Sequence, residues 1–183
     1  MKWTTQHLIA AGAMGALLAL TALSEIPLNV ITGVLGAGGV IGTFFELIVF
    51  VFAIMLIPRF GTGAIVAGIA AIILLPLPVF GPPGFLPKVA MLFGFGLLYD
   101  LLFFFFKRYG KWALALTTSA LIILFDVAFY FVLLLFKVQT NLSLAAFLIF
   151  NAVFIVEGIA GSLVGWYVFQ KLKNTAVVKR IQQ

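Results

Sequence analysis

The stretch LIILFDVAFYFVLLLF, residues 121–136, decides the class of this protein, and Asp126 is its one charged residue. The hydrocarbon core of a bilayer is about 30 Å thick, and a helix needs roughly 20 apolar residues to cross it. Together with the apolar residues that precede it, the stretch is long enough. An aspartate at the centre of a membrane helix costs roughly 2.5–3.5 kcal/mol on insertion scales. We therefore expect a membrane helix in which Asp126 has a defined role.

The rest of the chain has the same apolar character. Of 183 residues, 64% are hydrophobic and 9% are charged, whereas soluble domains contain roughly 25% charged residues. We predict an all-α integral membrane protein, a single six-helix transmembrane domain over residues 1–183 with the lipid bilayer as its solvent. The expected spans lie near 8–27, 34–57, 62–81, 87–106, 113–136 and 143–169.

The positions of the lysines and arginines predict the orientation of these spans. They concentrate in the two tails and in the loops after the second and fourth spans, whereas only Lys88 and Lys137 fall in the loops on the other side. Cytoplasmic loops carry an excess of Lys and Arg. Six spans with both termini in the cytoplasm satisfy this rule, so the net charge of +6 reports topology and does not indicate nucleic-acid binding.

A different interpretation of the amino end is a cleaved signal peptide. Residues 1–24 would then contain a basic start at Lys2 and a cleavage site at Ala22, Leu23 and Ser24. Cleavage would leave five spans and place the new amino end outside.

Several classes of chemistry have no residues to support them. The chain has no cysteine and a single histidine, His7, at the start of the first span, so we expect no metal site and no cysteine nucleophile. It also lacks the Gly-rich phosphate loop of nucleotide hydrolases. We expect no cofactor and no enzymatic activity, and any ATP would be hydrolysed by partner subunits.

Four of the five acidic residues fall within the spans, and they divide into two kinds. At 1.5 Å per residue, Glu46, Asp126 and Glu157 converge near the middle of the membrane. Asp100 lies nearer the inner end of its span, where we expect it to anchor the bundle through hydrogen bonds. No Lys or Arg lies deep in any span, so the other three carboxyls must be protonated, solvated or paired with a bound species.

Polar and aromatic residues near these acids complete a candidate pocket. Tyr130 lies one helical turn beyond Asp126 on the same face, and Asn151 lies near the outer end of the last span. An uncompensated acidic pocket with an aromatic face favours a cationic or amine-bearing ligand. A structural hydrogen bond from Asp126 to a neighbouring helix is the alternative.

Two outer connections adjoin this pocket. Residues 24–42 contain Glu25 and Asn29 together with one proline and several glycines, and this segment fits a lid folded over a cavity. The Pro-rich segment 76–87 is predicted to be a rigid loop, which either walls the pocket or forms a stiff turn.

Small residues recur four apart along the first span and predict a face for close helix packing. Packing within the bundle and docking of a partner both explain this pattern. The residues are Ala11, Gly12, Gly15, Ala16 and Ala19.

These features together resemble the substrate-binding S component of an energy-coupling factor transporter. They are six short-looped spans with both ends inside, the small residues of the first span, the start of the fourth span in PKVAMLFGFGLLYDLL (87–102), and the end of the sixth, GSLVGWYVFQKL (161–172). The resemblance covers nearly the whole chain.

The resemblance implies a high-affinity capture subunit for a vitamin or related micronutrient in the cell membrane of a prokaryote. Its partners would be a transmembrane coupling protein, docked on the small residues of the first span, and two cytoplasmic ATPase subunits. The site implied by the resemblance and by the acids comprises Glu25, Asn29, Glu46, Asp126, Tyr130, Asn151 and Glu157. The nickel and cobalt branch of the family is not expected, because it uses a histidine close to an exposed amino terminus.

Other classes of function remain open at this point. In a proton- or cation-coupled secondary transporter, Glu46, Asp126 and Glu157 would take up and release protons, although the two halves of the chain show no clear repeat. A membrane enzyme or a purely structural subunit would need neither coupling partners nor a gradient.

Overall fold

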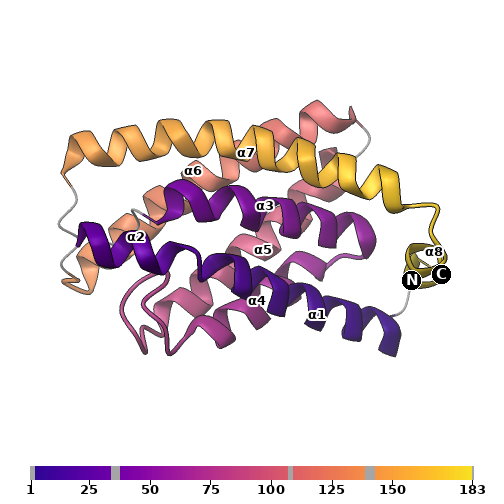
Figure 1. Cartoon of the computed structure of the whole chain (residues 1–183), viewed down its shortest axis with the longest axis horizontal. Coiled ribbons are helices and arrows are strands. Elements are labelled where there is room, and N and C mark those ends of the chain that lie inside the picture. Colours follow the sequence, from indigo (N-terminus) through magenta and orange to yellow (C-terminus); the bar gives the residue numbers. More distant parts are fainter. Residues whose placement is uncertain (1–2, 34–37, 107–108, 139–142, 183) are drawn as a thin grey trace.

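The computed structural model describes residues 3–33, 38–106, 109–138 and 143–182, and every regular element in them is an α-helix (Figure 1). The helices are α1 (Thr5–Ala22), α2 (Glu25–Thr32), α3 (Gly39–Leu56), α4 (Thr62–Leu74), α5 (Pro87–Phe106), α6 (Lys111–Leu135), α7 (Leu144–Leu172) and α8 (Ala176–Gln182).

The prediction of a helical membrane protein is confirmed by the lengths and hydropathy of these helices. Four apolar stretches are long enough to cross a membrane, namely Thr5–Thr32, Pro87–Phe106, Lys111–Leu135 and Ala145–Leu172. Two shorter apolar helices, Ile41–Leu56 and Thr62–Leu74, lie among them. The chain is therefore a multi-pass membrane protein, while the count of six spans stays a prediction.

Proline interrupts the helix of the first predicted span, which lies within the apolar stretch Thr5–Thr32, and shortens the helix of the third. The first helix ends at Ala22, and the short helix α2 begins at Glu25, because Pro27 has no N–H to continue the hydrogen bonds of α1. The helix α4 ends at Leu74 rather than near residue 81, just before Pro76. The 13 residues of α4 span only about 20 Å at 1.5 Å per residue.

The helices pack in a bundle with both chain termini at one end (Figure 1). The helix α7 lies against α3 and α6, and α4 lies against α5 and α1. We call the end with α8 and the termini the terminal end, and the opposite end, with α2 and the loop between α4 and α5, the loop end. This arrangement agrees with a chain that crosses the bundle an even number of times.

Glycines allow the closest contacts in the bundle. A Cβ at Gly96 of α5 would collide with the backbone of Gly63 and Ala64 at the start of α4. In α7, a Cβ at Gly161 would lie 2.9 Å from the carbonyl oxygen of Phe44, so α7 approaches α3 backbone to backbone. These contacts are the small-residue packing that membrane helices use where no hydrophobic force drives them together.

Asp100 is fully hydrogen-bonded to backbone groups near the terminal end. The Asp100 carboxylate accepts hydrogen bonds from the backbone N–H groups of Gly63 (2.9 Å) and Ala64 (3.1 Å) at the first turn of α4. A carboxylate is favoured there by the helix dipole and the free N–H groups. The prediction that Asp100 anchors the bundle through hydrogen bonds is confirmed.

His7 has a similar role in the same part of the molecule. Its Nδ1 pairs with Thr4 at the start of α1, and its Nε2 accepts a hydrogen bond from Nε of Arg59 at 3.2 Å. Both ring nitrogens therefore have protein partners, and His7 joins the amino end of α1 to the turn before α4.

Candidate functional site

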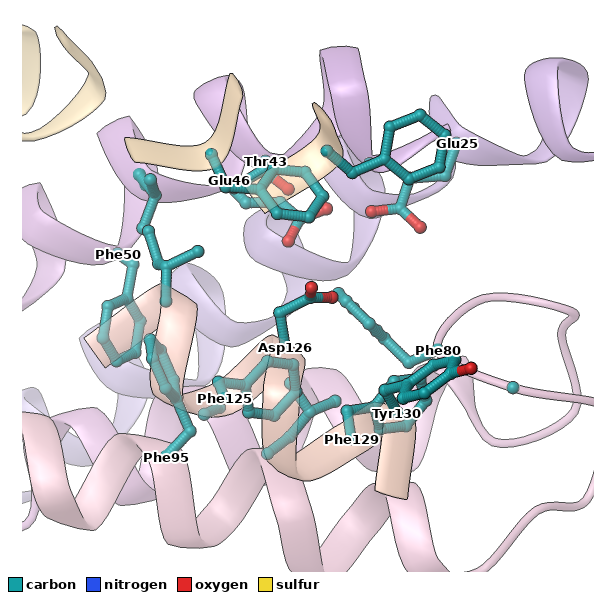
Figure 2. A pocket seen from close by; sticks show the side chains of 18 of the residues that line it. Glu25, Thr43, Glu46, Phe50, Phe80, Phe95, Phe125, Asp126, Phe129 and Tyr130 are labelled. Carbon is teal, nitrogen blue, oxygen red and sulfur yellow. The ribbon is translucent and has the colours of Figure 1, made fainter. Parts of the chain in front are cut away.

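A cavity of about 130 Å³ opens among the helices toward the loop end of the bundle. That volume is large enough for several water molecules or a small organic solute. Its polar lining comes from Glu25, Thr43, Glu46, Asp126 and Tyr130. Most of the other lining side chains are phenylalanines. We call this space the acidic cavity, and Figure 2 shows its labelled residues.

Glu25 and Glu46 form one side of the acidic cavity. They extend from α2 and α3, and Gly42 lies between them: a Cβ built on it would lie 3.2 Å from Oε1 of Glu25 and 3.3 Å from Oε1 of Glu46. The two carboxyl groups are close enough to share a hydrogen bond. Glu25 is only 3% exposed, so its carboxyl is buried in the protein and faces the cavity.

Asp126 extends from α6 on the opposite side, and its carboxyl points toward those of Glu25 and Glu46 (Figure 2). Asn151 of α7 donates a hydrogen bond from Nδ2 to Oδ2 of Asp126 at 2.8 Å and another to the carbonyl of Phe147 at 2.9 Å. This contact is the interhelical hydrogen bond considered from the sequence, and it leaves the Asp126 carboxyl on the cavity surface.

No lysine or arginine among the described residues forms an ion pair with these three carboxyls. Each therefore stays neutral only by holding or sharing a proton, and a charged form needs a cation or water in the cavity. Three acids that face one another in an apolar surrounding repel when ionised, and a bound cation removes that repulsion. The arrangement suits the capture of positive charge.

Aromatic rings form the rest of the cavity wall. Phe125 and Phe129 of α6 are nearly parallel, with ring centroids 5.8 Å apart and an interplanar angle of 8°. Phe80 meets both rings edge to face, at 6.2 Å and 6.4 Å. Tyr130 lies against Phe147 at 4.7 Å. Such faces attract cations through the ring quadrupole and accept flat apolar groups.

The loop between α4 and α5, residues 75–86, supplies Phe80 and Gly81 to this wall, and we call it the wall loop. Of the two interpretations of the Pro-rich segment, the cavity wall is the one observed. Phe80 has a φ of 50°, a left-handed conformation that is rare for a bulky residue and must be held by its surroundings.

Lys88 holds the wall loop in place. Its side chain is fully buried, and Nζ donates to the carbonyls of Leu74 (2.9 Å), Leu77 (2.8 Å) and Val79 (3.1 Å). All three N–H groups are therefore used on backbone oxygens at the end of α4 and in the loop. The Lys88 ammonium therefore binds the loop next to Phe80 and does not pair with an acid of the cavity.

The remaining predicted site residues lie around the cavity. Asn29 accepts a hydrogen bond from the backbone N–H of Gly38 at 2.8 Å, so it ties α2 to the start of α3. Residues 34–37 of the predicted lid lie outside the described residues. Glu157 does not line the cavity, but its carboxyl is close enough to Glu46 for the two charges to interact. One of its oxygens, Oε2, is buried without a hydrogen-bond partner in the described part of the chain.

The predicted docking residues of the first span divide into two groups. Ala11, Gly15 and Ala19 are buried in the bundle, and a Cβ at Gly15 would lie 2.8 Å from the Ile69 side chain of α4. The Gly15 side of α1 is thus packed against α4, and docking of a partner on the first span stays a prediction. Gly12 and Ala16 remain partly exposed.

Several residues of the site were not predicted from the sequence. From the sequence, Lys88 contributes to the topology and to the family resemblance only, Phe80 is one phenylalanine among 21, and Thr43 carries no signal. A lysine at the start of an apolar helix, directly after a Pro-rich loop, is a signal that could have pointed to the carbonyls of that loop.

Comparison of the chain with models of known protein families, with curated proteins and with solved structures finds no match in any of the three. The class that the helices define is a helical multi-pass membrane protein. Its function has to be argued from the acidic cavity itself.

Proposed function

We propose that the protein captures a small cationic or amine-bearing solute in the acidic cavity and delivers it for transport across the membrane. The observation that carries this proposal is the convergence of Glu25, Glu46 and Asp126 on one cavity, with no lysine or arginine of the described residues paired to them. An organic cation would neutralise the carboxyls, while its apolar part would lie against the phenylalanine rings.

The transport role rests on the position of this cavity. Its lining includes Glu25 of α2 and Phe80 of the wall loop, both at the loop end, whereas the termini lie together at the other end (Figure 1). With the basic tails in the cytoplasm, six spans would place the cavity toward the outside, as an uptake protein requires. Lys107 and Arg108, which contribute to this charge pattern, lie outside the described residues.

For the mode of energy supply, we propose a capture subunit of an ATP-driven micronutrient uptake transporter, resembling the S component of an energy-coupling factor system. Such a subunit would assemble with a transmembrane coupling protein and two cytoplasmic ATPases. If the first span takes part in docking, the surface open to a partner would be the partly exposed side around Gly12 and Ala16.

Ligand capture is tested by a thermal-shift screen of the detergent-purified protein against cationic, neutral and anionic vitamins and their precursors. A ligand at a thousand times its Kd stabilises the native state by about 4 kcal/mol, which a melting curve resolves easily. We expect shifts among the cations that disappear in Asp126→Asn. Stabilisation by anionic compounds alone would contradict the proposal.

The energy source is tested separately, by isolating the protein from its own membrane under mild detergent conditions. Copurification of two ATPases and a coupling protein, with uptake that stops when ATP hydrolysis is blocked, is the expected result. Solute uptake by the purified protein alone in liposomes, driven by a pH gradient, would instead establish a secondary transporter.

One observation favours that second candidate function. Glu157 lies outside the acidic cavity, yet its carboxyl interacts with Glu46, so Glu25, Glu46 and Glu157 form a chain of acids that extends beyond the cavity. Such chains serve as proton relays in membrane carriers. Loss of gradient-driven uptake in Glu157→Gln, with solute binding retained, would support this function.

A further inference from the structure

All five polar side chains that line the acidic cavity can accept hydrogen bonds. This property restricts the class of ligand more closely than the negative charge of the cavity does. Glu25, Glu46 and Asp126 carry carboxyl groups, which only accept when ionised. Thr43 and Tyr130 have hydroxyls, which both donate and accept. No lysine, arginine or side-chain amide N–H is among the described side chains that line the cavity.

The amide beside the cavity adds another acceptor. Nδ2 of Asn151 uses its two hydrogens on Asp126 and on the carbonyl of Phe147. If the amide were flipped, its Oδ1 would face two acceptors, Oδ2 of Asp126 and the carbonyl oxygen of Phe147. These two acceptors therefore fix the orientation of the amide. Oδ1 of Asn151 is then buried without a hydrogen-bond partner in the part of the chain that the structure describes.

Buried acceptors without donors recur at the same place. Oε1 of Glu46 has no hydrogen-bond partner among the described residues and lies against Gly42, beside Glu25. The Glu25 carboxyl beside it is 3% exposed, points into the cavity (Figure 2), and is close enough to share a hydrogen bond with Glu46. A buried acceptor without a donor is costly, and a donor from elsewhere recovers that cost.

Resting on the proposed function, we propose that the ligand of the acidic cavity is a planar, N–H-bearing organic cation, such as an amidinium, guanidinium or protonated aminoheterocycle. Its N–H groups would donate to Glu25 and Glu46 on one side and to Asp126 on the other. A quaternary ammonium ion carries the same charge but cannot donate a hydrogen bond, so it would leave these acceptors unsatisfied.

The aromatic wall favours a flat body on this cation. Phe125 and Phe129 present nearly parallel rings, and Phe80 closes the wall edge to face. A planar ring attached to the cationic group lies on such a surface without losing flexible torsions. An extended aliphatic polyamine would place further ammonium groups in this apolar part of the cavity, where the described side chains offer no carboxyl to pair with them.

The test uses small probes that share a phenyl ring and differ in the attached group. Benzamidine is a planar cation with several N–H donors, phenyltrimethylammonium is a cation with none, benzamide is the neutral counterpart of benzamidine, and benzoate is an anion. Their affinities for the detergent-purified protein are measured by thermal shift and by titration calorimetry.

We expect benzamidine to bind at least tenfold more tightly than phenyltrimethylammonium and benzamide, and benzoate to cause no shift. In Glu46→Gln, whose amide supplies a donor at the same place, the preference for benzamidine over phenyltrimethylammonium should fall severalfold. Lys171→Gln, an exposed change at the terminal end, is the matched control and should leave the preference unchanged.

The outcomes separate this inference from the proposed function. Equal affinity for both cations, or tighter binding of phenyltrimethylammonium, would overturn the requirement for N–H donors while the cation cavity stands. Tighter binding of benzamide or benzoate than of either cation would overturn both. A preference for benzamidine that Glu46→Gln leaves unchanged would also overturn the assignment to these acceptors.

Discussion

Asp100 and Asp126 are the two aspartates of this chain, and they lie in apolar helices with opposite surroundings. Asp100 is 2% exposed and caps the first turn of α4 through the N–H groups of Gly63 and Ala64. Asp126 has one side-chain donor, Asn151, and otherwise faces a cavity. The same functional group thus has a structural role at the terminal end and, in the proposed function, a binding role at the loop end.

This difference shows which property distinguishes a structural acid from a functional one in a membrane protein. Both aspartates are charged residues of a kind rare in membrane helices, and both cost free energy to insert. Neither property therefore tells a structural aspartate from a functional one. What separates them is whether the protein supplies enough hydrogen-bond donors. Asp100 receives the N–H groups of a helix start, whereas Glu25, Glu46 and Asp126 share a cavity in which donors are scarce.

The largest effect on stability should come from Asp100, and Asp126 is the matched comparison. Asp100→Ala leaves the N–H groups of Gly63 and Ala64 buried without an acceptor and should lower the free energy of unfolding by about 3 kcal/mol. Asp126→Ala should cost less than about 1 kcal/mol, since it also removes a charge from an acidic cluster. Unfolding in mixed detergent micelles measures both, and equal losses would break the comparison.

The next effect concerns the closest contact of α4 and α5. Gly96→Ala places a Cβ into the backbone of Gly63 and should cost about 1–3 kcal/mol. Gly94→Ala, on the same helix, is the control, because a Cβ there meets nothing within 4 Å. It should be neutral or stabilising by up to about 1 kcal/mol. A similar loss in both variants would show that the packing near Asp100 is not tight.

A smaller effect tests the wall loop. The chain has no cysteine, so Phe80→Cys creates a single reactive thiol in the cavity wall. Lys88→Met removes the ammonium that binds three loop carbonyls, each contact worth about 1 kcal/mol net. We expect a cationic thiol reagent to label Phe80→Cys roughly tenfold faster in this background.

The control for that experiment is Lys137→Met, which alters an exposed lysine near the same end of the bundle. Its labelling rate should equal that of Phe80→Cys alone. An unchanged rate in Lys88→Met would mean that the loop is held by its prolines and its apolar contacts, and that Lys88 does not position Phe80.

The smallest effect separates the two sides of α1. Gly15→Ala should cost about 1–2 kcal/mol, because a Cβ at Gly15 meets Ile69 and the carbonyl of Val66. Gly12→Ala has open space and should be neutral in the isolated protein. If Gly12→Leu leaves the isolated protein stable but reduces copurification with ATPase subunits, the partner docks on this side of α1. Normal assembly would place the docking surface elsewhere.

The sequence alone determined the class of this protein. Long apolar runs with few charges can be stable only in lipid, because backbone groups in a bilayer must be satisfied within helices. Composition and helix periodicity therefore sufficed to predict a helical membrane protein, and they marked Glu46, Asp126 and Tyr130, which the structure places on one cavity. They also sufficed for Asp100, whose distance from the middle of its helix marked it as a different kind of acid.

Only the tertiary structure decided which polar groups have hydrogen-bond partners and which do not. Hydrogen bonds between distant residues, such as those of Lys88 to the wall loop or Asn151 to Asp126, depend on how helices cross, and no local pattern encodes the crossing. The small residues of α1 likewise fit two kinds of neighbour, and packing buried Ala11, Gly15 and Ala19 in the bundle, with Gly15 against α4. Local propensity fixes helices, whereas a cavity forms only where packed side chains leave space between them.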